Sequence, residues 1–127
     1  MRYALLLHNH EPAPGEVAEE TIEEMQQLFD AYAKALEAAG VLVGGNILHP
    51  SRVATTITRR SGTTQVQDGP FAETKEALAG VFVIQVPDAD AALAWAEKCP
   101  GATYGSVEVR PVAVSLTAGA WTAHSPA

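Results

Sequence analysis

Asp68 and His8 are the residues whose types and positions most clearly permit chemistry. Asp68 opens residues 68–76, with the sequence DGPFAETKE. Gly69 can adopt positive φ, while Pro70 fixes its own φ near about −65° and disfavours the helical region at the residue before it. Such a turn holds the carboxylate of Asp68 still, so we expect it to line a pocket between two strands. An Asp at this place can instead accept hydrogen bonds from the backbone of its own turn.

His8 ends a short apolar strand predicted for residues 2–8, on the face of Ala4 and Leu6. An imidazole beside an ionised carboxylate can act as an acid or a base near neutral pH. We therefore expect His8 to face the same cleft as Asp68 and to be its partner in cofactor-free proton transfer. The alternative is that His8 only closes the end of the strand.

Four further side chains are candidate contacts for a small organic ligand. Phe71 offers an apolar anchor after the turn, and Lys75 offers a cation. Arg52 can hold a carboxylate through its planar fork, and His49 lies near it in the chain. Surface roles are the alternative for these residues.

A metal site is a weaker interpretation. His8, His10 and Glu11 offer nitrogen and oxygen donors, but so short a segment seldom surrounds zinc without another ligand such as His49. Cys99 is the sole cysteine, which excludes an intrachain disulfide and a thiolate cluster built from one chain. The glycines match neither a phosphate loop nor a dinucleotide fingerprint. We expect no metal and no cofactor.

Composition limits the class of protein. The 127 residues are 47% hydrophobic and 18% charged, as in one globular domain with a real core. A net charge of −7 argues against nucleic acid or an anionic membrane as the main partner. The apolar run at the N-terminus is too short for a signal peptide, and no stretch is long enough to span a bilayer. We expect a cytoplasmic protein.

The hydrophobic periods predict the elements that must position these residues. A helix is predicted from residue 21 to its C-cap at Gly40, and a second helix begins at Asp88. The remaining elements are strands at 2–8, 41–48, 78–86 and 104–114, and a hairpin over 52–67 that turns at Ser61 and Gly62. In the last strand, Glu108 and Arg110 share a face.

This order predicts an α+β fold, a ferredoxin-like βαββαβ sheet with an inserted β-hairpin over residues 1–114. Both helices then cover one face, and Val81 and Val83 lie on the uncovered face. An apolar face of this size favours a homodimer with two sheets packed face to face, a dimeric α+β barrel. The alternative is a monomer whose hairpin folds over the sheet. Residues 115–127 form a C-terminal extension that continues or frays beyond the domain.

Three segments resemble the DGPF-type branch of the YCII-related family: DGPFAETKE, LAGVFVIQVPDADAALAWAEKCP and GSVEVRPV. The resemblance covers residue 1 to about residue 114 and implies a ferredoxin-like fold and a dimeric α+β barrel. It also implies a histidine and aspartate pair in the enzymes of the wider family. Asp68 matches the motif, but Glu19, Glu20 and Thr21 stand where the family histidine is expected.

Two functions therefore stay open. In the first, the protein binds a small organic ligand beside the dimer interface and carries out lyase or isomerase chemistry at Asp68 and His8. In the second, it is a non-catalytic regulatory or interaction module, and the resemblance implies an extracytoplasmic-function sigma factor as its partner.

Overall fold

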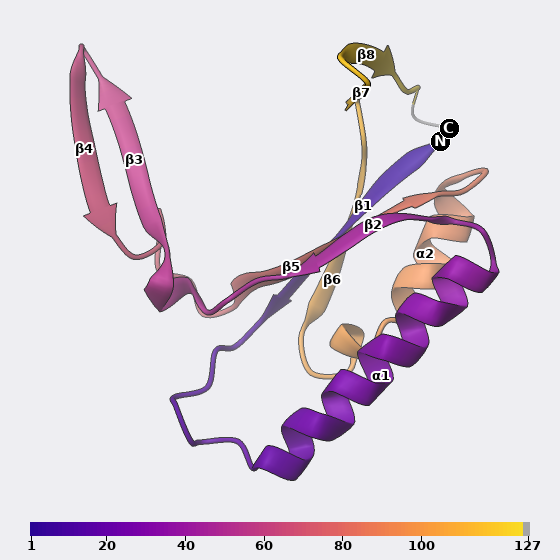
Figure 1. Cartoon of the computed structure of the whole chain (residues 1–127), viewed down its shortest axis with the longest axis horizontal. Helices are drawn as coiled ribbons and strands as arrows, with labels where there is room; N and C mark the ends of the chain where they lie inside the picture. The colour runs from indigo at the N-terminus through magenta and orange to yellow at the C-terminus, as the bar shows by residue number, and fades with distance from the viewer. Residues whose placement is uncertain (126–127) are drawn as a thin grey trace.

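A four-stranded antiparallel sheet carries two helices on one face in the computed structural model, which describes residues 1–125 (Figure 1). Its strand order is β2-β5-β1-β6. The strands are β1 (Arg2–Asn9), β2 (Leu42–Ile47), β5 (Ala77–Gln85) and β6 (Ser106–Pro111), and the helices are α1 (Glu19–Ala38) and α2 (Ala89–Lys98). These six elements follow one another in the order β1-α1-β2-β5-α2-β6, with the β3–β4 pair (Thr55–Arg60 and Thr63–Asp68) between β2 and β5, so the α+β prediction is confirmed.

The core lies between the sheet and the helices. Alternate residues of β1, Tyr3, Leu5 and Leu7, are buried on the helix side. Phe82 of β5 stacks with Phe29 of α1 at 6.5 Å between ring centroids, and Tyr32 meets Phe82 edge to face at 5.5 Å. These aromatic contacts lock α1 onto the centre of the sheet.

Local signals set the helix ends. Gly40 follows α1 with φ of 71°, the left-handed conformation that glycine adopts at low cost. Asp88 caps α2, since its carboxylate accepts a hydrogen bond of 2.9 Å from the backbone N–H of Ala91. The hydroxyl of Tyr32 donates to the carbonyl of Trp95 at 2.7 Å and joins the two helices. Neither helix of the described chain is long and apolar enough to cross a membrane.

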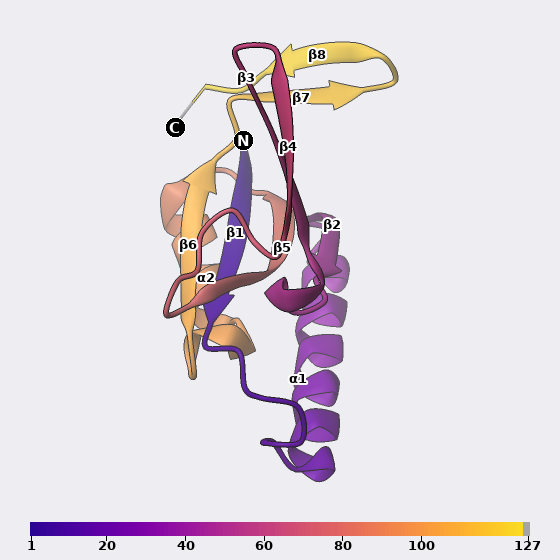
Figure 2. The same cartoon turned by 90° about the vertical axis from the view of Figure 1, so that its left-hand side faces the viewer.

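The hairpin between β2 and β5 stands apart from the main sheet. Strands β3 (Thr55–Arg60) and β4 (Thr63–Asp68) pair with each other and turn at Ser61 and Gly62, both with positive φ. A short 3-10 helix, Ser51–Val53, joins β2 to the hairpin. Figures 1 and 2 show the hairpin rising past the end of the sheet and not lying over its open face.

A second hairpin forms at the C-terminus, where the sequence predicted only a continuing or fraying extension. It consists of β7 (Val114–Thr117) and β8 (Ala120–Ala123). The turn between them holds Ala118 at φ of 51° and Gly119 at φ of 79°. Alanine rarely adopts positive φ. The residue type at position 118 therefore does not indicate a turn in the sequence. Residues 126 and 127 of the predicted extension lie outside the described residues.

The sheet face opposite the helices carries Leu6, Val81 and Val83, all partly exposed. No helix or strand of residues 1–125 lies over this face, which is seen between the two hairpins in Figure 1. The dimeric barrel that would cover it stays a prediction.

Two neighbouring glycines of β2 test how tightly the core is packed. A Cβ at Gly45 would lie 2.6 Å from Cδ1 of Phe82, whereas a Cβ at Gly44 would meet nothing within 4 Å. Phe82 cannot yield easily because Phe29 and Tyr32 hold its ring. We expect Gly45→Ala to lower the free energy of unfolding by about 1–3 kcal/mol. Urea unfolding measures the loss, and Gly44→Ala is the matched control; equal stabilities for the two variants would contradict this packing.

Candidate functional site

Two cavities open at the end of the sheet where β1 and β2 stop. The first, of about 280 Å³, is bounded by the loop after β1, the start of α1 and the end of β2; its apolar wall includes Val17, Ile22 and Leu48. The second, of about 310 Å³, is bounded by the 3-10 helix and the segment after β4. Glu11 and Arg52 line both cavities. These two residues therefore lie between the first cavity and the second, and we call them the partition.

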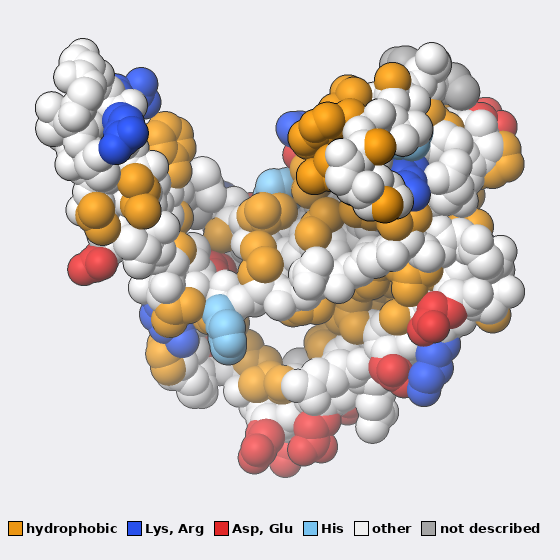
Figure 3. All heavy atoms as spheres, turned by 45° about the horizontal axis from the view of Figure 1, so that its top comes forward, with side chains coloured by type: hydrophobic (Ala, Val, Ile, Leu, Met, Phe, Trp, Pro, Cys, Tyr) orange, Lys and Arg blue, Asp and Glu red, His pale blue; other side chains and the backbone are white. Residues whose placement is uncertain are grey.

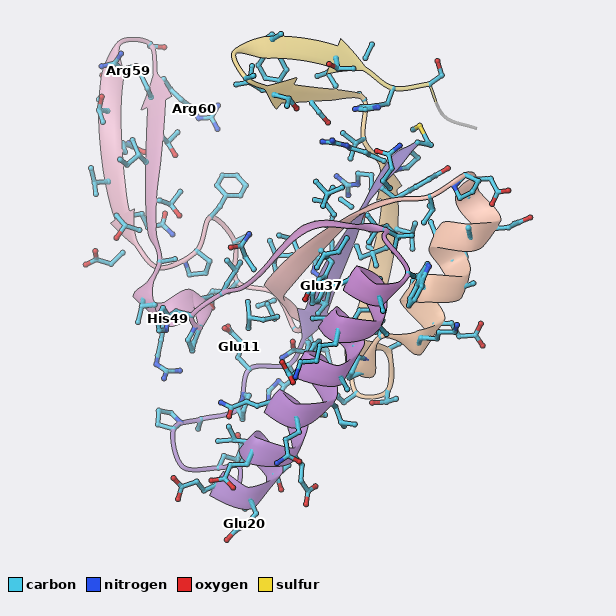
Figure 4. The ribbon with its side chains drawn as sticks, turned by 45° about the vertical axis from the view of Figure 1, so that its right-hand side comes forward. Glu11, Glu20, Glu37, His49, Arg59 and Arg60 are labelled. Atoms are coloured by element: carbon cyan, nitrogen blue, oxygen red, sulfur yellow. The ribbon has the colours of Figure 1, made fainter. Side chains whose placement is uncertain are left out.

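Glu11 ties the loop after β1 to the 3-10 helix. Its carboxylate accepts a 2.6 Å hydrogen bond from the backbone N–H of Ser51 and another from the Ser51 hydroxyl. These two hydrogen bonds, that of the hydroxyl first, hold the pKa of Glu11 below its ordinary value. Figure 4 shows Glu11 and His49 at this end of the molecule, far from Arg59 and Arg60 at the tip of the β3–β4 hairpin. The Glu11–Ser51 contact joins segments 40 residues apart and holds the partition in place.

Arg52 follows directly after this contact. Its charge favours the ionised form of Glu11 and contributes to the lowered pKa of that carboxyl. No ion pair engages the Arg52 guanidinium among residues 1–125, and the side chain is exposed. Lys75, also exposed, lines the second cavity with His10 and Glu73. Two cationic side chains thus face one cavity in a chain of net charge −7.

The segment after β4 forms the turn that its sequence predicts. Gly69 has φ of 100°, and its N–H donates to the carbonyl of Ala54 at 2.7 Å. Its own carbonyl accepts a 2.9 Å hydrogen bond from the hydroxyl of Thr56. Gly69 and Pro70 line the second cavity through this rigid turn.

Asp68 and Phe71 flank that turn but line neither cavity. Asp68 is the last residue of β4, opposite Thr55, and is exposed. Phe71 is 75% exposed. Within the described residues no hydrogen bond holds the Asp68 carboxylate. The turn is held by the backbone of Ala54 and the hydroxyl of Thr56, both of which bond to Gly69.

His8 lies on the open face of the sheet and has a different carboxylate as its partner. Its Nε2 is 3.3 Å from Oε1 of Glu108, and the guanidinium of Arg110 donates to the other oxygen of Glu108. Arg110 first, and His8 after it, lower the pKa of Glu108. No hydrogen bond or ion pair joins His8 to Asp68 in the part of the chain that the structure describes. The predicted pair of His8 and Asp68 stays a prediction.

Three of the four predicted ligand contacts line the cavities, and Phe71 does not. Arg52 and Lys75 line the second cavity together, and Arg52 and His49 line the first. The sequence indicated Glu11 only as a possible metal ligand. It did not indicate the contact of Glu11 with Ser51. Across residues 1–125, no three His, Cys, Asp or Glu side chains are grouped as ligands of a metal ion.

Comparison with known proteins places the chain in a family. The YCII-related domain matches residues 1–115. The chain belongs to the YCII-related family. A relative from Rhizobium meliloti (strain 1021), "Uncharacterized protein R00369", is 37% identical over 116 residues, which cover 90% of this chain and 94% of that protein. The family resemblance seen in the sequence is confirmed, while the DGPF branch stays a prediction.

In this YCII-related protein, we expect the Glu11–Ser51 contact to give a pH-dependent part of the stability. The folded pKa of Glu11 is lowered, so its contribution is fully present above the unfolded pKa of about 4.3 and is lost as the pH falls through the folded value. Urea unfolding of the protein and of Glu11→Gln from pH 7 to pH 3 measures it. The difference in stability should be constant at neutral pH and shrink in acid; a difference that grows in acid contradicts the contact.

Proposed function

We propose that this YCII-related protein binds a small organic carboxylate in the two cavities beside Arg52. The observation that supports this function is the position of Arg52, which lines both cavities and is held next to the Glu11–Ser51 contact. A guanidinium with free donors matches the two oxygens of a carboxylate in a bidentate arrangement.

The surroundings of Arg52 define the class of ligand. Lys75 supplies a second positive charge in the second cavity, and His10 supplies a ring nitrogen. Leu48 and Ile22 give the first cavity an apolar wall that suits a hydrocarbon or aromatic portion. The volumes of about 280 and 310 Å³ lie just below and just above the lower limit of roughly 300 Å³ for ligand pockets. The ligand is therefore a small anion with an apolar part.

Removal of the Arg52 guanidinium tests this function. We expect Arg52→Ala to weaken binding of small aromatic and aliphatic carboxylates by about 10-fold to 100-fold, since a charge-assisted hydrogen bond contributes roughly 1.5–3 kcal/mol. Ligand-detected NMR with a panel of carboxylates gives the affinities. Arg60→Ala, which removes a cation at the hairpin tip, is the matched control. Equal affinities for the Arg52→Ala and Arg60→Ala proteins would exclude the site.

Cofactor-free acid/base chemistry is a second candidate, because His8 has an oriented carboxylate partner. Glu108 accepts from Arg110 and lies at hydrogen-bonding distance from His8, so Glu108 can fix the direction of the imidazole. In this proposal His8, which lies on the open sheet face and lines neither cavity, is the acid or base of a lyase or isomerase step on a ligand bound at that face. Asp68 takes part only if its carboxylate reaches His8 in the assembled protein.

Two isosteric variants separate the partners of His8. We expect Glu108→Gln to change the ¹⁵N chemical shifts of the His8 ring at neutral pH, because it removes the charge 3.3 Å from Nε2. Asp68→Asn should leave these shifts as they are. A response to Asp68→Asn alone would reverse the assignment and restore the His8 and Asp68 pair.

A further inference from the structure

The second cavity is lined mainly by polar side chains, in contrast to the first. Its lining includes Arg52, Lys75, His10, Ser51 and Thr74. The first cavity has the apolar wall described above and shares only the partition with the second. One ligand that reaches both cavities would therefore place an apolar portion in the first and a polar or charged portion in the second.

Lys75 is held on the segment that leads into β5. Ala77, the first residue of β5, pairs with Asn9 of β1, so the register of the sheet fixes the end of this segment. The hydroxyl of Thr74 donates to the backbone carbonyl of Glu76, which closes a bend around Lys75. The sheet thus positions Lys75 at the second cavity separately from the 3-10 helix on the other side of the partition.

The acidic neighbours leave the ammonium of Lys75 available to a ligand. The carboxylate of Glu76 accepts a 3.3 Å hydrogen bond from the hydroxyl of Ser106, and Glu76 lines neither cavity. Glu73 lines the second cavity, but no ion pair joins it to Lys75 within residues 1–125. The oxygens of Glu11 accept from Ser51.

Two cations at one cavity are unusual for a chain of this composition. Acidic residues outnumber Lys and Arg by 15 to 8, so a carboxylate at a cavity is expected by composition and two cations are not. Figure 3 shows Lys and Arg side chains at the foot of the β3–β4 hairpin, apart from the acidic side chains gathered over the start of α1. The cations of the second cavity therefore indicate a ligand with more than one acidic group.

We propose that the ligand is a dicarboxylate with an apolar substituent and that Lys75 selects its second carboxylate. The first carboxylate binds the forked guanidinium of Arg52, the second binds the compact ammonium of Lys75, and the apolar substituent lies in the first cavity. This inference rests on the proposed binding of a carboxylate at Arg52, and it makes Lys75 the residue that determines specificity.

Two matched acids test the role of Lys75. Phenylsuccinate has two carboxylates, and the phenylbutyrate with a methyl group in place of one of them has the same skeleton. We expect titration calorimetry at low salt to show phenylsuccinate binding about fivefold more tightly, the size of one contact between exposed charges in water. Lys75→Gln should remove this advantage and leave the affinity for phenylbutyrate unchanged.

Lys34→Gln is the matched control. It removes an exposed lysine of α1 that lines neither cavity, so the advantage of phenylsuccinate should persist. If Arg52→Ala weakens both acids but phenylsuccinate has no advantage, or if Lys75→Gln and Lys34→Gln reduce it equally, the carboxylate site stands and the role of Lys75 is wrong. If neither acid binds, or Arg52→Ala weakens neither, the proposed function fails as well.

An ammonium-bearing ligand provides a further test of the second cavity. Phenylalanine carries an ammonium group that phenylpropionate lacks, and Glu73 could bind it. We expect phenylalanine to bind no more tightly than phenylpropionate. Tighter binding of phenylalanine that is lost in Glu73→Gln would overturn the inference, because the second cavity would then select a cation.

Backbone amide chemical shifts locate the second carboxylate. At equal saturation, phenylsuccinate should shift the amide signals of Thr74 and Lys75 more than phenylbutyrate does, because only the diacid reaches this segment. Its advantage in affinity should also shrink as the salt concentration rises, since exposed charges are screened. Equal shifts with the two acids would contradict the assignment.

Discussion

Because α1 and α2 pack on the same face of the sheet, each central strand buries alternate side chains and turns the others away from the core. Tyr3, Leu5 and Leu7 fill the core, and Leu6 and His8 face the open side. The cavities and the hairpins lie outside this packed layer of sheet and helices. The cavities lie at one end of the sheet, and the two hairpins leave from its opposite ends on the side away from the helices.

The site proposed to bind a carboxylate depends on the loops at the end of the sheet more than on the sheet itself. Glu11 and Ser51 bring together the chain after β1 and the chain after β2, and Arg52 follows from their contact. Membership of the YCII-related family, with a relative that is itself uncharacterised, leaves the reaction open. The function therefore has to be argued from the side chains at the cavities. A sigma factor partner stays a prediction of the resemblance.

Local patterns were sufficient to predict most of the fold. The helices, the Asp88 cap and the turn at Ser61 and Gly62 all follow from residue types a few positions apart. Contacts between distant segments were not predictable in this way. His8 and Glu108 are 100 residues apart, and their contact requires the register of β1 against β6. The β7–β8 hairpin escaped prediction because Ala118 occupies a turn position that usually takes glycine or asparagine.

We propose, as the family resemblance implies, that a second copy covers the open face of the sheet and stabilises the β7–β8 hairpin. Amide hydrogen exchange of β7 and β8, followed as the protein is diluted, measures this most directly because an isolated hairpin opens readily. We predict protection at high concentration that falls together with the fraction of dimer. Exchange that is fast at every concentration, or protection that does not change on dilution to the monomer, would contradict this dimer.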